Sequence, residues 1–152
     1  MSTSSASDYQ FIRPAEWTDA PVVYAFLCEL EGTTLDQTRF RAVFRHNLAN
    51  PAVHYFVAEP AGEVVGFVSC HIQYLLHHNG KVAEIQELFV RPEHRNARVG
   101  RHLLDAVTAL AIREGCINLE VTTNQRRTDA LRFYERAAFR RSHYKLVKPI
   151  QA

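Results

Sequence analysis

Residues 83–114 change hydrophobic period half-way, and this change constrains the fold more than any other feature of the sequence. Residues 83–90 form an apolar run interrupted by two glutamates and a glutamine, as is typical of a mostly buried strand. Pro92 follows and ends the strand, because proline has no N–H to offer a sheet. Apolar residues then recur at helical spacing: Val99, Leu103, Leu104, Val107, Leu110 and Ala111. The stretch therefore predicts a buried strand that leads through a short turn into an amphipathic helix.

The turn between this strand and helix is basic and opens directly into the helix. Residues 95–101 read Arg-Asn-Ala-Arg-Val-Gly-Arg. The first N–H groups of a helix have no intrahelical partners and lie at the positive end of its dipole, so arginines beside them favour a phosphate or pyrophosphate ligand. A single glycine and the lack of Gly-Lys-Ser/Thr exclude a Rossmann fingerprint and a Walker loop. Taken alone, the turn could also be one that holds no ligand.

The remaining segments predict a mixed α/β fold. Around the central strand and helix we expect, in order, a strand at 11–14, helices at 17–30 and 36–48, hairpin strands at 54–59 and 63–71, a strand at 117–122, a helix at 129–138 and a final strand at 142–147. The order β-α-α-β-β-β-α-β-α-β predicts one domain over residues 10–150, with a central, largely antiparallel twisted sheet flanked by helices. The Ser-rich residues 1–9 are expected to form a disordered tail.

Composition argues against several classes of protein. A formal net charge of +2 on 152 residues gives no reason to expect a nucleic-acid partner. No apolar stretch approaches the ~20 residues that span a membrane, and the first residues lack the basic and apolar segments of a signal peptide. Cys28, Cys70 and Cys116 are widely spaced and form no C-x-x-C pair, which favours free thiols in a reducing compartment. We therefore expect a cytoplasmic protein.

Two motifs together resemble the GNAT N-acetyltransferases. The usual turn of that family, Arg/Gln-x-x-Gly-x-Gly/Ala, matches Arg95 to Gly100, with Arg98 where the first glycine is usual. If the backbone at Arg98 needs a positive φ, arginine costs about 1 kcal/mol more there than glycine. The second motif, residues 124–139, resembles the family block Asn…Ala-x-x-Phe-Tyr-Glu-x-x-Gly-Phe, with Ala138 in place of the glycine.

The resemblance implies a GNAT-like fold and acetyl-CoA as the cofactor. In the family, the tyrosine that matches Tyr134 lies near the coenzyme sulfur and can protonate the departing thiolate, and the residue that matches Asn124 binds the pantetheine arm. The expected cofactor-binding residues are Leu88, Phe89, Val90, Arg95, Asn96, Ala97, Arg98, Val99, Gly100, Arg101, Asn124 and Tyr134. Considered without the turn, Phe133 and Tyr134 are also typical of a core aromatic pair on a helix.

A closer resemblance, over about residues 10–148, is to the aminoalkylphosphonate N-acetyltransferases. It rests on short motifs that are weak singly and more specific together, among them Gly62-Glu63-Val64-Val65-Gly66, His71-x-Gln73, Glu84-Ile85-Gln86-Glu87-Leu88 and Ser142-His143-Tyr144. The resemblance implies transfer of the acetyl group of acetyl-CoA to the primary amine of a small aminoalkylphosphonate, by direct attack in a ternary complex. Such enzymes are also reported to depend on a divalent metal.

The reaction needs a base, because an alkylamine is protonated at neutral pH and only its free form attacks a thioester. The central strand offers Glu84 and Glu87, which strand alternation places on opposite faces unless a bulge intervenes. We favour Glu84 as the catalytic base, although both carboxylates could instead be solvated or salt-bridged residues. A backbone N–H near residues 88–90 is expected to stabilise the developing oxyanion, and Tyr134 to return a proton to the sulfur.

A phosphonate needs cations, and the candidates for substrate binding are Arg45, His77, His78 and Arg127. The adjacent histidines could also hold a metal, although neighbouring side chains seldom point the same way and no spacing here matches a zinc signature. A third option is that both are surface residues of a turn.

Two alternatives to a phosphonate acceptor stay open at this point. The chain could acetylate another amine, such as an aminoglycoside, a polyamine or a protein N-terminus. It could also be a non-catalytic, acyl-CoA-binding regulatory domain, against which the retention of Tyr134 and two strand carboxylates argues. Dimerisation is common in such folds, so a homodimer is one option, for which the sequence identifies no interface.

Overall fold

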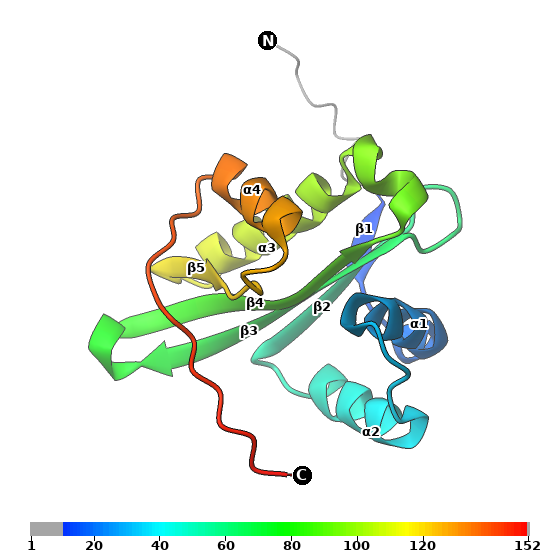
Figure 1. The fold of residues 1–152 in the computed structure, drawn as a ribbon, viewed down its shortest axis with the longest axis horizontal. Helices are drawn as coiled ribbons and strands as arrows, with labels where there is room; N and C mark the ends of the chain where they lie inside the picture. The colour runs from blue at the N-terminus through cyan, green and yellow to red at the C-terminus, as the bar shows by residue number, and fades with distance from the viewer. Residues whose placement is uncertain (1–10, 152) are drawn as a thin grey trace.

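A five-stranded sheet with helices on both faces forms the framework of the protein (Figure 1). A computed structural model describes residues 11–151, apart from the side chains of residues 96 and 97. The tail predicted at residues 1–9 lies outside this range. The strands, in their order across the sheet, are β1 (Ile12–Pro14), β2 (Val53–Ala58), β3 (Gly66–Leu75), β4 (Gly80–Val90) and β5 (Asn118–Val121). Neighbours are antiparallel except for β4 and β5, which are parallel.

Four helices and three short 3-10 turns connect the strands. The helices are α1 (Ala20–Glu31), α2 (Gln37–Leu48), α3 (Val99–Arg113) and α4 (Thr128–Arg136), and the turns are η2 (Trp17–Asp19), η3 (Leu76–His78) and η4 (Pro92–Ala97). Asp36 begins α2 because its carboxylate accepts the Arg39 N–H at 2.8 Å. Within residues 11–151, every helix is too short or too polar to cross a bilayer.

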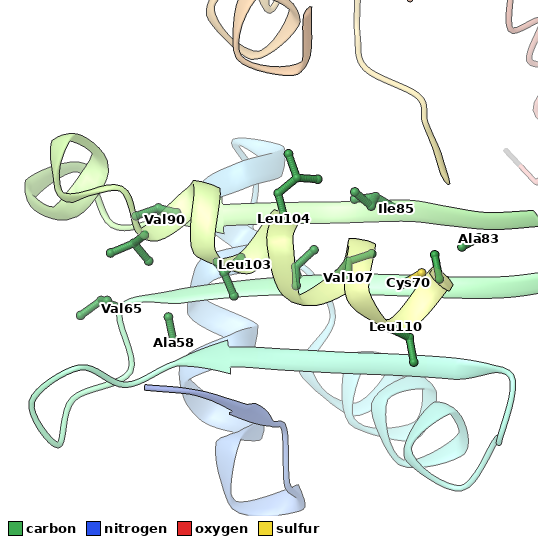
Figure 2. Close-up of a cluster of buried hydrophobic side chains, with 13 residues drawn as sticks. Ala58, Val65, Cys70, Ala83, Ile85, Val90, Leu103, Leu104, Val107 and Leu110 are labelled. Atoms are coloured by element: carbon green, nitrogen blue, oxygen red, sulfur yellow. The ribbon is translucent and has the colours of Figure 1, made fainter. Parts of the chain in front are cut away.

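Two hydrophobic cores lie on opposite faces of the sheet. On one face, α3 packs Leu103, Leu104, Val107 and Leu110 against apolar side chains of β3 and β4 such as Ile85 (Figure 2). On the other face, α1 and α2 cover β2 and the end of β4, where the Phe26 and Phe89 rings stack with centroids 4.8 Å apart. β4 contributes Ala83, Ile85 and Val90 to the first core and Phe89 to the second, so the strand is buried on both faces, as its sequence predicts.

The predicted order of elements is confirmed up to the last helix, with one correction at the C-terminus. The strand predicted at residues 142–147 is wrong, because residues 139–151 belong to no helix or strand. The Tyr144 and Leu146 side chains are each 92% exposed. A strand becomes stable only when it pairs with a neighbour and buries a face, and here the segment does neither. The alternating pattern indicates only that a strand can form.

Candidate active site

The strands β4 and β5 run side by side for only part of their lengths. They pair from Val82 with Asn118 to Ile85 with Val121, where β5 ends. β4 continues through Gln86–Val90, and among the described residues no strand pairs with the outer edge of that continuation. An open strand edge presents backbone donors and acceptors, so a ligand could bind here as a missing strand would.

The backbone groups of Leu88 and Val90 point toward this open edge. The Arg91 N–H donates to the Val65 carbonyl at 2.8 Å, which marks that pair as a hydrogen-bonded one. Hydrogen-bonded and non-hydrogen-bonded pairs alternate along an antiparallel ladder, so the N–H and C=O groups of Leu88 and Val90 face away from β3. Arg95 uses the Val90 carbonyl, with Nε at 3.1 Å. The two N–H groups are thus placed to serve as donors to a ligand.

The turn after β4 brings the N-terminus of α3 to this edge. A Cβ atom on Gly100 would lie 3.7 Å from a Val90 methyl group, so the first turn of the helix adjoins the end of β4. Arg98 adopts φ +62° and ψ +15° immediately before the helix, and its carbonyl accepts the His102 N–H at 3.0 Å. The backbone at Arg98 therefore has the positive φ that the sequence analysis considered, and arginine occupies this left-handed conformation at a cost of about 1 kcal/mol relative to glycine.

The three arginines of the turn differ in their contacts. Arg95 is held at the Val90 carbonyl and lies 5.9 Å from the Phe89 ring centroid. Arg101 pairs with Asp105 one turn further along α3, at 3.2 Å. The exposed Arg98 makes no hydrogen bond or ion pair through its side chain within residues 11–151, which leaves its guanidinium available to an anion. The backbones of Asn96 and Ala97 belong to η4, whereas their side chains lie outside the description.

Tyr134 lies on α4 beside the start of α3. The ring of its neighbour Phe133 is 3.6 Å from where a Cβ on Gly100 would lie, so the two helices are in contact here. Tyr134 is 7% exposed, with Phe133 and Phe139 packed edge-on against its ring. Burial raises its pKa to about 12, and the nearby positive charge of Arg127 acts in the opposite direction. The phenol is therefore neutral at physiological pH and carries a proton that it can donate.

The turn that follows β5 links α4 to the other face of the sheet. The Asn124 side-chain oxygen accepts the Arg126 N–H at 2.9 Å, and its carbonyl accepts the Arg127 N–H at 2.9 Å. The Arg127 guanidinium reaches across to the Leu30 carbonyl in the last turn of α1, at 2.6 Å. The turn thus spans the open edge of β4, with α4 on one side and α1 on the other.

A bulge in β4 changes the arrangement of the two candidate carboxylates. Ser69 pairs with Glu87 and the next residue, Cys70, pairs with Ile85, so Gln86 is an additional residue in β4. Glu87 therefore shares a face with Glu84, because their partners Ser69 and His71 are two residues apart in β3. The sequence placed the two carboxylates on opposite faces unless a bulge intervened, and the bulge puts both on the side of the sheet that α1 and α2 occupy, about 7 Å apart along the strand.

Ser69 is a site residue that sequence reasoning missed. It is fully buried, and its hydroxyl donates to the Glu87 carboxylate while accepting the Glu87 backbone N–H at 2.9 Å. Because the N–H can only donate, the hydroxyl proton is directed to the carboxylate, which fixes the orientation of Glu87. The sequence signal is a single serine within the buried run Gly66–Cys70, which does not by itself identify its partner.

A second polar contact on this face joins β2 to α2. Tyr55 pairs with Ser69 in the sheet, and its hydroxyl accepts the Asn47 side-chain N–H at 2.6 Å. Burial raises the pKa of Tyr55; the hydrogen bond from Asn47 opposes this effect and the charge of Glu87 adds to it. Polar side chains therefore line the sheet from α2 to β4 on the same face as both carboxylates.

The predicted phosphonate-binding residues do not converge. Arg45 lies over the Trp17 ring, with its guanidinium carbon 4.3 Å from the centroid. His78 faces Glu120 of β5 at 3.6 Å. The ring of the exposed His77 lies 4.3 Å from the His78 ring, tilted by 46°, in η3 at the end of the β3–β4 hairpin. Arg127 alone of the four contacts both the turn after β5 and the end of α1. For the described part of the chain, no group of three His, Cys, Asp or Glu side chains could hold a metal.

Comparison with known proteins gives one family match, two similar relatives and one similar structure. Residues 10–139 match the acetyltransferase (GNAT) family model. The chain is 42% identical over 139 residues to the aminoalkylphosphonate N-acetyltransferase of Salmonella typhimurium, covering 91% of this chain and 90% of that protein. It is 30% identical over 110 residues to the aminoglycoside N(6')-acetyltransferase type 1 of Klebsiella aerogenes, covering 69% and 72%. The fold is similar to that of a transcriptional regulator from Bacillus halodurans, with a TM-score of 0.85 and 24% identity over 91% of this chain and 98% of that one.

Proposed function

The chain belongs to the GNAT family of acetyl-CoA-dependent N-acetyltransferases, and from this premise we propose that it acetylates the primary amine of a small aminoalkylphosphonate. The observation that carries the proposal is the 42% identity with an aminoalkylphosphonate N-acetyltransferase. Because the match covers 91% of this chain, it includes the four helices and strands β2–β4, and therefore both the elements beside the carboxylates and the turn that precedes α3.

Acetyl-CoA would bind along the open edge of β4. Its pyrophosphate would face the first N–H groups of α3 and the guanidinium of Arg98, where the helix dipole favours negative charge. Its pantetheine arm would follow Gln86–Val90 and pass near Asn124. The unused N–H groups of Leu88 and Val90 support this placement, because an extended amide chain offers the carbonyls that they need.

The amine would attack the thioester directly in a ternary complex. The nitrogen lone pair forms the new C–N bond and the carbonyl π electrons move to oxygen. The positively charged nitrogen then releases a proton to solvent, and collapse of the oxyanion breaks the C–S bond to leave the amide and the thiolate. The Leu88 N–H, pointing into the open edge, is suited to stabilise the oxyanion. No cysteine need act as nucleophile; burial raises the pKa of the Cys70 thiol to about 12, which leaves it protonated.

Glu87 is the better-placed base. It lies in the part of β4 that extends past β5, where the thioester would bind, whereas Glu84 lies in the part still paired with β5. Ser69 holds one Glu87 oxygen, and the other can accept the ammonium proton directly or through a water. Glu84, about 7 Å along the same face, would attract the positively charged amine. The bulge thus shifts our preference from Glu84 to Glu87.

Tyr134 would protonate the departing thiolate. Its hydroxyl retains its proton because burial raises its pKa to about 12, so a proton is available throughout the physiological range. So weak an acid can give up its proton only after negative charge has developed on the sulfur. Proton donation by Tyr134 would therefore occur late in C–S bond cleavage.

Arg127 is the cation best placed for a phosphonate. It lies near Tyr134, contacts the end of α1 through one N–H, and carries further donors suited to a phosphonate oxygen. Arg45 lies over the Trp17 ring, and His77 and His78 lie together beside Glu120. These three residues are therefore left out of the proposal. The donor set of residues 11–151 does not fit a protein-held divalent metal, so no step is assigned to one.

A second candidate acceptor is an aminoglycoside, which the 30% identity with an aminoglycoside acetyltransferase favours. The acceptors differ in charge: a polycationic aminoglycoside would favour Glu84 and Glu87 as its main contacts, whereas a phosphonate requires Arg127 as well.

The test is thiol release from acetyl-CoA with 2-aminoethylphosphonate, aminomethylphosphonate, kanamycin and spermidine, each with and without EDTA. We expect turnover of the two phosphonates only, and a KM for 2-aminoethylphosphonate that rises at least tenfold in Arg127→Gln. Arg126→Gln, the adjacent exposed arginine, is the matched control. Turnover of kanamycin or spermidine alone would retain the acetyltransferase and reject the phosphonate. Loss of activity with EDTA would contradict the omission of a metal.

A further inference from the structure

The single tryptophan of the chain, Trp17, holds two arginines of α2 against its ring. The guanidinium carbon of Arg45 lies 4.3 Å from the ring centroid, and that of Arg41 lies 5.5 Å from it. Residues four positions apart share a face of a helix, so these like charges repel each other, and the attraction of both to one indole ring offsets the repulsion. Trp17 therefore keeps two positive charges close together on the surface of the domain.

These two charges have no carboxylate partner within residues 11–151. Their guanidinium groups contact the indole ring and form no hydrogen bond or ion pair there. α2 contains three arginines and a histidine but no acidic residue, and Asp19, in the same turn as Trp17, is bound to Arg13 at 2.9 Å. Each guanidinium carries five N–H donors. Two of them side by side suit an anion with several oxygens and more than one charge, as in a phosphate or a phosphonate.

A cavity of about 170 Å³ continues this surface at the end of α2. Leu48 lines the cavity and lies on the same face of the helix as Arg41 and Arg45, because positions i, i+4 and i+7 form one stripe. Ala15, two residues before Trp17, lines it from the other side. The cavity is therefore about one helical turn beyond Arg45.

The cavity suits an uncharged, mostly apolar group. Pro14, Leu48, Val53 and Phe56 supply apolar walls, and no Asp, Glu, Lys or Arg lines it. Burial lowers the pKa of His54, which also lines the cavity, so its ring is neutral at physiological pH. An apolar cavity of about 150 Å³ holds one benzene ring. The cavity is thus large enough for the body of a small organic molecule.

This surface is separate from the open edge of β4. β1, which leads into the turn that carries Trp17, is separated from β4 by β2 and β3, so the two regions are about three strand spacings, or roughly 14 Å, apart. In Figure 1, α2 and β5 lie on opposite sides of β3 and β4. Arg127 contacts the far end of α1. A ligand over Trp17 therefore occupies neither of the sites proposed above for the coenzyme and the acceptor.

We propose that Arg41, Arg45 and the adjoining cavity form a second binding site, which takes a small organic phosphate or phosphonate. The anionic oxygens bind both guanidinium groups, and an uncharged body no larger than one ring enters the cavity. An anion without such a body uses the arginines alone and binds more weakly. An aminoalkylphosphonate is disfavoured, because its ammonium group meets two cations and no carboxylate. The site does not depend on the proposed acetyl transfer, and its test requires no turnover.

Titration of the full-length protein with phenylphosphonate tests the proposal. Because Trp17 is the only tryptophan, a ligand that draws the arginines toward itself should change the tryptophan fluorescence, and the change should saturate. At constant ionic strength, phenylphosphonate should bind about tenfold more tightly than methylphosphonate, as burial of one ring implies, and at least fivefold more tightly than benzoate, which has a single charge. Equal affinity for phenylphosphonate and methylphosphonate, or the same fluorescence change with potassium chloride alone, would overturn the proposal.

Variants then locate the ligand, with phosphorus NMR line widths as a measure of binding that does not involve Trp17. Arg41→Gln and Arg45→Gln should each weaken the binding of phenylphosphonate at least fivefold. Arg39→Gln is the matched control, because it removes an exposed arginine of the same helix that lies outside the stripe, and it should leave the affinity unchanged. Circular dichroism shows that each variant is folded. Unchanged affinity in Arg41→Gln and Arg45→Gln would overturn the proposal. Loss of binding in Arg127→Gln would place the ligand in the proposed acceptor site and would overturn it as well.

Discussion

The two sides of the open edge of β4 are built from different kinds of groups. On the side where we propose that the coenzyme binds, the donors are backbone N–H groups of Leu88, Val90 and the first turn of α3. They are exposed because β5 ends before β4 does and because α3 begins beside this edge. On the side where we propose that the acceptor binds, the groups are side chains from separate elements, such as Glu87 on β4, Ser69 on β3 and Arg127 after β5. A backbone site tolerates changes of side chain, whereas a side-chain site depends on each member. Substitutions on the acceptor side should therefore reduce activity more.

The largest effect is expected for Glu87→Gln. The amide cannot take the ammonium proton, so kcat/KM should fall about 10² to 10³-fold. The measurement is kcat/KM for 2-aminoethylphosphonate between pH 6 and 10, where the loss should diminish at high pH as the free amine becomes abundant. Glu84→Gln is the matched control on the same face and should cost less, mainly in KM. A larger loss in Glu84→Gln, with the same recovery at high pH, would return the base to Glu84.

Tyr134→Phe should have the second-largest effect. The substitution removes the hydroxyl that protonates the thiolate and keeps the aromatic packing. We expect kcat to fall about 10²-fold and the KM for acetyl-CoA to change less than about threefold. A phenol acts as an acid only when protonated, and burial raises the pKa of Tyr134 to about 12. Tyr134 should therefore cause no decline in rate below about pH 10. Tyr24→Phe, on α1, is the control; equal kcat in Tyr134→Phe and the wild type would remove Tyr134 as the acid.

The same comparison explains what could be predicted from the sequence. The coenzyme side depends on local patterns, namely a change of period, a basic turn and Phe133-Tyr134, so its elements were found within a few residues of their bounds. The acceptor side depends on pairing between distant residues. Ser69 and Glu87 are 18 positions apart, and the shared face of Glu84 and Glu87 results from a bulge opposite β3. The failed strand at 142–147 has the same cause, because alternation in a segment does not identify its partner.

Ser69→Ala should have an intermediate effect and acts through Glu87. It removes the donor that orients the carboxylate and leaves the Glu87 N–H without its acceptor. We expect kcat to fall about tenfold, as for a positioning residue one step from the base, with the KM for acetyl-CoA unchanged because the coenzyme side is intact. Ser69→Thr keeps the hydroxyl and should recover most of the loss. If Ser69→Thr were as slow as Ser69→Ala, packing at this buried position would be the cause, and the positioning role would be rejected.

The smallest effect is expected at Arg98, where both the backbone and the side chain of one residue would contribute to coenzyme binding. Its backbone is strained at φ +62°, and its side chain is available to the coenzyme. Arg98→Gly should raise the unfolding free energy by about 1 kcal/mol, about 2–4 °C in Tm for a domain of this size. It should also raise the KM for acetyl-CoA about three- to fivefold, as the loss of one exposed charge contact implies. Arg98→Ala separates the two, because it keeps the strain and loses the charge, so KM should rise equally with no gain in Tm. An unchanged KM in both variants would show that backbone groups alone bind the coenzyme phosphates, and the division between a backbone site and a side-chain site would be sharper than proposed.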